Sequence, residues 1–197
     1  MLKKVQEIYE HLDFKDVMNA IVENELAGNI DAAYKFSYAG VGKSGYSFGR
    51  SQFDVSNNYK AVEFLRKNGF TDSNINRLKN LDPSINDLNA KLWNIKDKVD
   101  KYDELHVKDM CKHVASLDGL PPMTVKTFVH LVDYHNQFNL SRNGKMHEFL
   151  KSNKNYILSI EIYEFKLSNT KWGKENPLDV KRRYKTIEKY FDKKEEK

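Results

Sequence analysis

Residues 34–55 read YKFSYAGVGKSGYSFGRSQFDV, and this stretch departs most clearly from the helical patterning of the rest of the chain. It holds four of the nine glycines, at positions 40, 42, 45 and 49. Glycine permits a positive φ and a close approach of a ligand to the backbone, and the alternation of Tyr46 with Phe48 suits a short strand. The stretch therefore predicts a small β-hairpin or a glycine-rich loop.

Outside this stretch, apolar residues recur at the three- and four-residue spacing of amphipathic helices. Gly69 and the pair Pro121-Pro122 mark helix boundaries, and Asn176-Pro177 reads as an N-cap followed by a proline at the first helical position. Helices are expected at 14–26, 59–68, 73–81, 84–99, 103–117, 124–138, 146–167 and 177–191. The predicted fold class is mainly α (α+β), with a small β-hairpin.

The chain has 197 residues, of which 40% are hydrophobic, and it shows no internal repeat or low-complexity linker. We therefore expect a single domain over residues 1–197. No run of 18 apolar residues occurs, and charges interrupt the N-terminal region where a signal peptide would be apolar. The sequence thus predicts a protein made in the cytoplasm without a signal peptide, and a monomer is the default expectation.

Cys111 is the single cysteine, and no Cys/His cluster has the spacing of zinc ligands, although His106 and His113 lie in one region. No metal and no cofactor are expected. Cys111 also lacks the surroundings that would suggest a Cys-His protease with His135, and the chain has no Gly-x-Ser-x-Gly nucleophile elbow. Cleavage of a glycan is therefore favoured over cleavage of a peptide.

The formal net charge is +5, and residues 181–197 alone carry eight Lys/Arg against four Asp/Glu. The basic C-terminal helix, 177–192, could contact an anionic partner such as the cell envelope, or it could be an ordinary solvated helix. Nucleic-acid binding is not expected, because the charge lies in one terminal segment and no nucleic-acid-binding motif accompanies it.

Glu25 occupies an unusual position for a charged residue. In a helix over residues 14–26, Glu25 falls on the apolar side, whereas Glu23 projects from the opposite side. The apolar side is formed by Phe14, Val17, Met18, Ile21 and Val22. A carboxyl group among apolar side chains is disfavoured in its charged form, so it keeps a proton that a general acid can donate in glycosidic cleavage. The alternative is a glutamate at a fraying helix end that turns to water or pairs with a lysine.

The helix end and the glycine-rich stretch together resemble a known family. A helix that closes with Glu25-Leu-Ala-Gly28, followed by Ser44-Gly-Tyr-Ser-Phe-Gly49 and Gln52-Phe-Asp54, resembles the lysozyme-like superfamily, especially phage endolysins and related muramidases. The resemblance is most specific over residues 14–58. It implies a lysozyme-like helical domain in which a glutamate closes the first helix of the active site and a small hairpin borders the sugar-binding groove.

The resemblance also implies roles for individual residues. Glu25 would be the proton donor, and Ser47 would be the hairpin hydroxyl that positions the attacking water. Tyr46 and Gln52 would lie along the groove as substrate ligands.

The second catalytic group is less clearly indicated, because the familiar phage-type enzymes carry an aspartate in the hairpin and this chain has none between residues 32 and 53. Asp54, with Asp31 as the alternative, would be the second carboxylate, or a positioned water would act without one. The separation that distinguishes inverting from retaining pairs cannot be read from the sequence.

A second group of polar residues lies near the end of the helix expected at 124–138, in the stretch Asp133-Tyr-His-Asn-Gln-Phe138. Tyr134 and Asn136 are candidate sugar ligands, because an amide pairs with hydroxyl and N-acetyl groups while an aromatic ring covers the apolar face of a sugar. In lysozyme-like folds, a long helix after the hairpin forms the far wall of the groove. The alternative is a structural polar cluster that ties this helix to its neighbours.

These features predict an enzyme that acts on the cell wall and hydrolyses the β-1,4 bond between N-acetylmuramic acid and N-acetylglucosamine in the glycan strands of peptidoglycan, with the substrate implied by the resemblance. Two alternatives are a lytic transglycosylase that cleaves the same bond, and a non-catalytic helical protein that binds wall glycan.

Overall fold

The computed structural model describes residues 1–38, 40, 43–153 and 155–195, except for the side chains of residues 194 and 195. Its internal contacts divide the chain into two compact units. The terminal unit contains Met1–Asn24 together with the chain from His106 onward, and the central unit contains Glu25–Leu105. The chain passes from one unit to the other inside two helices, α2 (Phe14–Leu26) and α6 (Lys96–Ala115).

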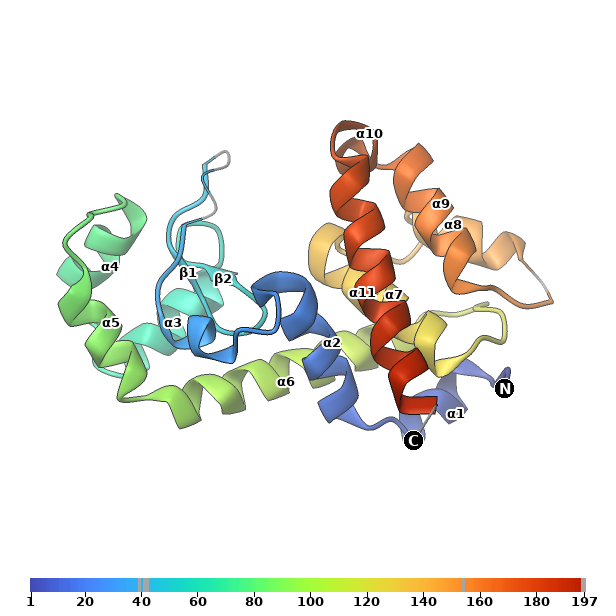
Figure 1. Cartoon of the computed structure of the whole chain (residues 1–197), viewed down its shortest axis with the longest axis horizontal. Coiled ribbons are helices and arrows are strands. Elements are labelled where there is room, and N and C mark those ends of the chain that lie inside the picture. Colours follow the sequence, from blue (N-terminus) through green and yellow to red (C-terminus); the bar gives the residue numbers. More distant parts are fainter. Residues whose placement is uncertain (39, 41–42, 154, 196–197) are drawn as a thin grey trace. The chain divides into compact units, whose positions relative to one another are not determined.

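The described residues form mainly helices and one two-stranded antiparallel sheet, which confirms the predicted fold class (Figure 1). The central unit contains the 3-10 helix η1 (Ile30–Tyr34), strands β1 (Ser47–Phe48) and β2 (Phe53–Asp54), and helices α3 (Tyr59–Lys67), α4 (Asp72–Lys79) and α5 (Asn86–Trp93). The terminal unit contains α1 (Val5–Glu10), α7 (Val125–Phe138), α8 (Lys145–Ser152), α9 (Ser159–Asn169), α10 (Lys171–Glu175) and α11 (Pro177–Glu195).

Two of the predicted helices are wrong, because the structure divides each of them into two elements. The segment 84–99 divides into α5 and the start of α6, because Asn94 and Ile95 close the end of α5 with hydrogen bonds to Ala90 O and Leu92 O. Apolar spacing continues across this break, so the pattern conceals it. Helix α6 then runs on to Ala115 and includes the segment 103–117, which was expected to be a separate helix.

The segment 146–167 divides into α8 and α9. Between them the chain leaves the helical path, because Ile157 donates its N–H to Pro122 O at 3.2 Å. Helix α9 then restarts where Glu161 accepts a hydrogen bond from the N–H of Leu158 at 2.8 Å. The spacing of apolar residues does not reveal a tertiary contact to a distant proline, so this break could not be predicted from it.

The hairpin predicted from residues 34–55 is confirmed, although Gly42 lies outside the described residues. Ser47 pairs with Asp54 and Phe48 with Phe53. Phe48 is completely buried and packs edge-on against Phe36 and parallel to Phe64. These aromatic rings, with aliphatic residues of α3, α4 and α5, form the core of the central unit.

The core of the terminal unit surrounds α7, whose residues from Thr127 to Tyr134 are all buried. Helices α1, α9 and α11 pack against it. Helix α11 turns Val180, Ile187 and Phe191 inward, so its apolar side is part of this core. Among the described residues, no helix combines the length and the apolar composition that crossing a membrane requires.

Candidate functional site

The loop of the hairpin is fixed by the carboxylate of Asp103, a residue of α6. Asp103 accepts hydrogen bonds from the backbone N–H groups of Arg50 at 2.7 Å and Ser51 at 3.0 Å. Gly49 precedes them with a φ of 77°, and a Cβ at this position would lie 2.9 Å from Asp103 Oδ2 and 2.8 Å from the ring of Phe53. Glycine is therefore required at position 49, because the loop backbone approaches its neighbours too closely for a side chain.

Asp103 is completely buried, and burial raises its pKa to about 6 in spite of the two amide hydrogen bonds. Its carboxylate faces the loop and not solvent, so it acts by positioning the hairpin. The sequence contained the signal for this residue, since Asp103 continues the four-residue spacing of Val99 and Val107 on the apolar side of α6. Asp103 therefore shares with Glu25 the feature of a carboxylate on the apolar side of a helix.

The hairpin is also tied to η1, the short helix that follows the end of α2. Gly49 donates its N–H to Ala33 O at 2.8 Å, and Ser37 and Ser47 exchange backbone hydrogen bonds of 2.9 and 2.7 Å. Ala33 belongs to η1, only a few residues after Glu25. Backbone hydrogen bonds therefore link the segment that follows Glu25 directly to both ends of β1.

A side-chain network strengthens this link. Tyr34 donates its hydroxyl to Asp100 at 2.8 Å, and the guanidinium of Arg50 donates to the same carboxylate at 3.0 Å. Burial, and then the neighbouring Asp100 carboxylate, raise the pKa of Tyr34 to about 12, so the phenol keeps its proton at neutral pH. The network joins η1, the hairpin loop and α6.

Glu25 lies in the last turn of α2 and is half-buried, whereas Glu23 is exposed as predicted. The helix ends at Leu26, and Ala27 and Gly28 then take positive φ angles of 49° and 75°. The position of Glu25 at the helix end agrees with the sequence analysis.

Asn24, the residue before Glu25, is held on two sides within the terminal unit. Its side-chain amide donates to Asp133 at 3.3 Å, and its backbone carbonyl accepts from Arg182 at 3.1 Å. Asn24 is only 3% exposed. Asn24 lies three and four residues after the buried Ile21 and Ala20, so it continues the apolar side of α2, and this spacing is the sequence signal for a buried amide.

Asp133 is the centre of a buried group of charges on α7, α9 and α11. It accepts hydrogen bonds from Lys166 at 2.8 Å and from Arg183 at 2.5 Å. Burial alone would raise the pKa of Asp133, but the Arg183 and Lys166 cations outweigh it and hold the pKa well below its ordinary range. Burial lowers the pKa of Lys166. Helix α9 can carry this lysine so close to α10 because Gly173 packs directly on the Lys166 carbonyl, where a Cβ would lie 1.9 Å away.

The predicted hairpin residues differ in how their side chains are used. Gln52 donates its amide to Gly49 O at 3.0 Å and accepts from the Ser37 hydroxyl at 2.9 Å. Tyr46 donates its hydroxyl to Asp82 O at 3.2 Å. These bonds stabilise the hairpin and engage the groups that were expected to bind substrate.

Asp54, the first candidate for the second carboxylate, organises the turn after β2. Its Oδ1 accepts from the N–H groups of Gly45 at 3.0 Å and Ser56 at 2.7 Å, and its Oδ2 accepts from the Asn57 amide at 2.6 Å. Asp31, the alternative, is exposed in η1. The Ser47 hydroxyl makes no hydrogen bond to the described residues, so among the hairpin candidates it is the polar group left for a ligand or a water.

Tyr134 and Asn136 belong to the terminal unit, near the end of α7. Tyr134 is 8% exposed and Asn136 is half-buried. The intervening His135 stacks on His113 with ring centroids 4.2 Å apart. Burial, and then the neighbouring His113 and His106, lower the pKa of His135 to about 4, so the imidazole is neutral at pH 7. Burial also raises the pKa of the Cys111 thiol to about 12, which makes it a poor nucleophile.

Within the described part of the chain, no three His, Cys, Asp or Glu side chains are arranged to hold a metal ion. Comparison with known proteins finds no match to the chain among protein-family models, curated proteins or solved structures.

Proposed function

We propose that the chain is a peptidoglycan-cleaving glycosidase in which Glu25 protonates the leaving oxygen of the glycosidic bond. The observation that carries the proposal is a half-buried glutamate at the end of a helix, between two segments that hydrogen bonds hold in place. Glu25 follows Asn24, whose side chain and carbonyl are both hydrogen-bonded, and it precedes η1, to which the hairpin is tied. A general acid needs such fixation, because small displacements of the proton donor reduce the rate strongly.

Ser47 is the proposed partner for the attacking water. Its hydroxyl lies on β1 in the same compact unit as Glu25, and among the predicted hairpin site residues it is the one whose side chain makes no hydrogen bond to the described residues. A hydroxyl can both accept from and donate to a water molecule, so it can orient a nucleophile without being charged. The bonds of Asp54 favour a structural role for that carboxylate, which leaves a mechanism with one carboxylate and a positioned water.

The substrate follows from the family resemblance of residues 14–58, which suggests cleavage between N-acetylmuramic acid and N-acetylglucosamine. Product analysis after incubation with purified peptidoglycan tests the reaction. New reducing ends indicate hydrolysis, and anhydromuramic ends would replace this mechanism with a lytic transglycosylase. If the glycan is bound but not cleaved, the non-catalytic alternative holds and the proposal fails.

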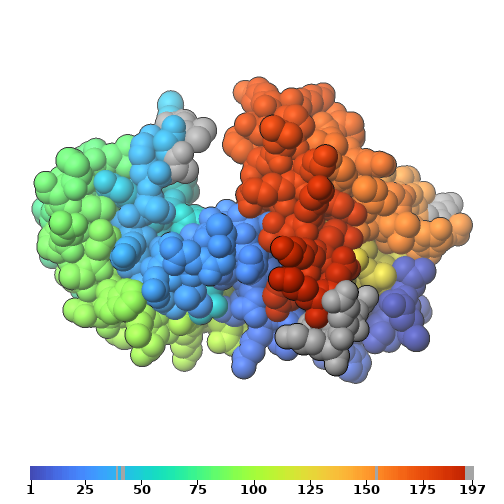
Figure 2. All heavy atoms as spheres, in the orientation of Figure 1, coloured from blue at the N-terminus to red at the C-terminus, as the bar shows by residue number. Residues whose placement is uncertain are grey.

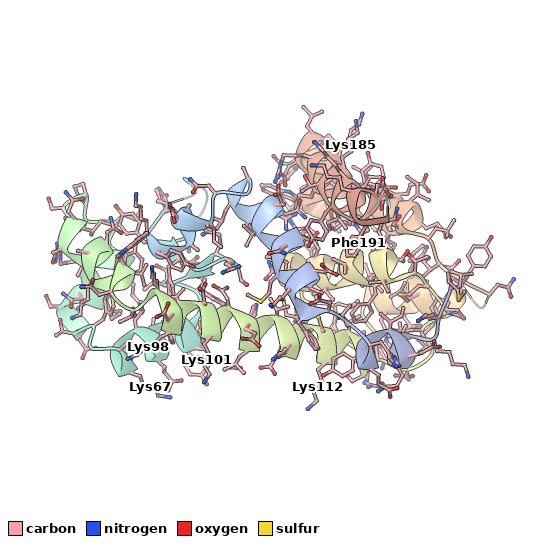
Figure 3. The ribbon with its side chains drawn as sticks, turned by 60° about the horizontal axis from the view of Figure 1, so that its bottom comes forward. Lys67, Lys98, Lys101, Lys112, Lys185 and Phe191 are labelled. Atoms are coloured by element: carbon pink, nitrogen blue, oxygen red, sulfur yellow. The ribbon has the colours of Figure 1, made fainter. Side chains whose placement is uncertain are left out.

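Contact with an anionic envelope is proposed for α11, where four exposed lysines recur at four-residue spacing. This lysine row consists of Lys181, Lys185, Lys189 and Lys193. None of the four has an ion-pair partner among the described residues. The α11 acids whose side chains are described pair elsewhere: Asp179 with Arg182, Glu188 with Lys126 and His130, and Asp192 with Lys126. One side of α11 faces solvent (Figure 2), and Lys185 projects from it (Figure 3).

The lysine row predicts salt-sensitive wall binding. Changing all four lysines to glutamine should abolish most binding to purified cell walls at low salt, because the attraction acts between exposed charges. The matched control changes Lys67, Lys98, Lys101 and Lys112, which are also exposed and are labelled in Figure 3. Cosedimentation measures both. Equal loss in the two variants, or wall binding that 0.5 M salt leaves unchanged, would remove this role.

A further inference from the structure

The turn between α7 and α8, residues 139–144, is attached at both ends to histidine side chains of the terminal unit. Near its start, Nε2 of His113 on α6 donates to Leu140 O at 2.6 Å, since a carbonyl oxygen can only accept. Near its end, Asn143 donates its N–H to the imidazole of His147 at 2.8 Å. The position of this α7–α8 turn therefore depends on the protonation of imidazoles.

His147 lies on α8, is completely buried and uses both of its ring nitrogens. Nε2 donates to Asp118 O at 2.8 Å, and Nδ1 accepts the N–H of Asn143. These two hydrogen bonds fix the neutral tautomer that carries its proton on Nε2. A second proton, on Nδ1, would point at the Asn143 N–H. Protonation of His147 therefore removes the hydrogen bond that holds the end of the turn.

His135 of α7 supplies a second imidazole that is suited only to the neutral form. Its ring stacks on that of His113, with centroids 4.2 Å apart and planes 8° from parallel. Its Nδ1 is buried and has no hydrogen-bond partner among the described residues. A proton there would be a buried donor without an acceptor, and it would place a positive charge against the His113 ring. Burial, and then the neighbouring His113 and His106, lower the pKa of His135 to about 4.

The charged side chains near His147 already pair with one another. The Asp118 carboxylate pairs with Arg142, and Glu148 pairs with Lys151 at 3.2 Å. A backbone hydrogen bond, and then the Arg142 and Lys151 cations, lower the pKa of Asp118, so this carboxylate stays charged and paired at pH 5. Neither acid is left over to compensate a histidinium at position 147.

We propose that the α7–α8 turn is an acid-sensitive switch: protonation of His147 and His135 releases the turn and exposes Leu140 and Met146. Both of these side chains are only 2% exposed while the turn is closed. The switch belongs to the terminal unit and does not depend on glycan cleavage.

The sign of the effect follows from the two states of His135. In water a histidine has a pKa near 6.5, whereas in the closed turn the pKa of His135 is about 4. Release therefore takes up a proton below pH 6.5, and the closed turn loses stability as the pH falls from about 6.5 towards 4. This one histidine makes release roughly 20-fold more favourable at pH 5 than at pH 7.

Amide hydrogen exchange of the whole labelled protein, followed by NMR and expressed as protection factors, tests the switch. The Asn143 and Gly144 amides report on the turn, since Gly144 donates to Ser141 O at 3.0 Å. The Met123 amide, which donates to Lys3 O at 2.9 Å, reports on another part of the same unit. Between pH 7 and pH 5, protection of the turn amides should fall by roughly tenfold or more, and that of Met123 by less than about threefold. Unchanged protection of the turn, or an equal fall at Met123, would overturn the proposal.

Variants that cannot take up the protons identify the histidines responsible. His135→Phe keeps a ring against His113, and His147→Asn keeps an acceptor oxygen close to the position of Nδ1 for the Asn143 N–H. In the double variant, protection of the turn amides should change by less than about threefold over the same pH range. His11→Gln removes an exposed histidine and should leave the wild-type fall intact. A double variant that shows the full fall would contradict the proposal.

The imidazole nitrogens give a readout in the wild-type protein that does not require the double variant to fold. The ¹⁵N shifts of His147 distinguish its two neutral tautomers and its protonated form. At pH 7 we expect the neutral form with the proton on Nε2, and its protonation should coincide with the loss of protection at Asn143. A protonated His147 beside an Asn143 amide that remains protected would show that the turn does not respond to this proton, and the proposal would be wrong.

Discussion

Asp103 and Asp133 are both almost completely buried, but their surroundings act on them in opposite directions. Burial raises the pKa of Asp103 to about 6, although it accepts hydrogen bonds from the backbone amides of Arg50 and Ser51. Asp133 has two cations within hydrogen-bonding distance, which outweigh burial and lower its pKa. The two residues therefore give the protein different responses to pH.

Asp103 should make the protein less stable as the pH rises from about 4 to about 7. The folded state holds the proton to a higher pH than the unfolded state, so it binds more protons in this window and loses stability as they leave. The side chain of Asp103→Asn cannot ionise. The unfolding free energy of this variant, relative to that of the wild type, should therefore rise by roughly 3 kcal/mol across the window. Urea denaturation at several pH values measures it. If the unfolding free energies of wild type and variant differ by the same amount at every pH, Asp103 does not titrate in this range.

Asp133 should stabilise the protein at every pH above about 4, because its lowered pKa keeps it charged beside its two cations. Asp133→Asn removes the carboxylate that accepts hydrogen bonds from the buried Lys166 and Arg183 cations, and we expect a loss of about 3 kcal/mol or more in unfolding free energy. Asp192→Asn breaks an exposed pair with Lys126 and should cost less than about 1 kcal/mol. Similar losses of unfolding free energy in the two variants would contradict the expectation that the buried ion pairs of Asp133 stabilise the fold.

At the scale of elements, the hairpin shows how a very short sheet is held in one position. Each strand has only two residues, so backbone pairing alone supplies little stability. The loop bonds to Asp103, the Gly49 bond to η1 and the burial of Phe48 provide the rest. The fixed hairpin in turn holds the Ser47 hydroxyl in place.

Gly49 and Gly40 allow this interpretation to be tested. Both have a positive φ, 77° and 71°, but a Cβ at Gly40 meets no atom of the described residues within 4 Å. Alanine at either position pays the conformational cost of about 1 kcal/mol, and Gly49→Ala must in addition displace Phe53 or Asp103. We expect the loss of unfolding free energy in Gly49→Ala to exceed that in Gly40→Ala by about 1–2 kcal/mol. Thermal and urea denaturation measure the difference, and equal losses would mean that the loop can move away from α6.

At the scale of the whole molecule, the sequence predicted the elements better than their connections. The helical class, the hairpin and the end of α2 after Glu25 follow from local spacing and glycine placement, and the structure contains them. The division of 84–99 and of 146–167 could not be predicted, because each depends on contacts made after the chain folds, such as the bond from Ile157 to Pro122.

The candidate site was predictable to a similar extent. A carboxylate on an apolar side identifies Glu25, and would have identified Asp103 by the same rule. The hydrogen bonds that engage Gln52, Tyr46 and Asp54 depend on the folded hairpin. Residue type and spacing therefore did not distinguish these groups from the Ser47 hydroxyl, which bonds to no residue in the described part of the chain. The buried charges around Asp133 come from three helices that are far apart in the sequence.

The central claim is that Glu25 supplies the proton for glycan cleavage, and the rate of reducing-end formation from purified peptidoglycan tests it most directly. Glu25→Gln keeps the shape of the side chain but cannot donate a carboxylic proton, and we expect its rate to fall by about 10²–10⁴-fold. Glu23→Gln makes the same change two residues away on the exposed side of α2 and should retain the wild-type rate. Circular dichroism shows that both variants are folded. A folded Glu25→Gln variant that cleaves at the wild-type rate would contradict the account.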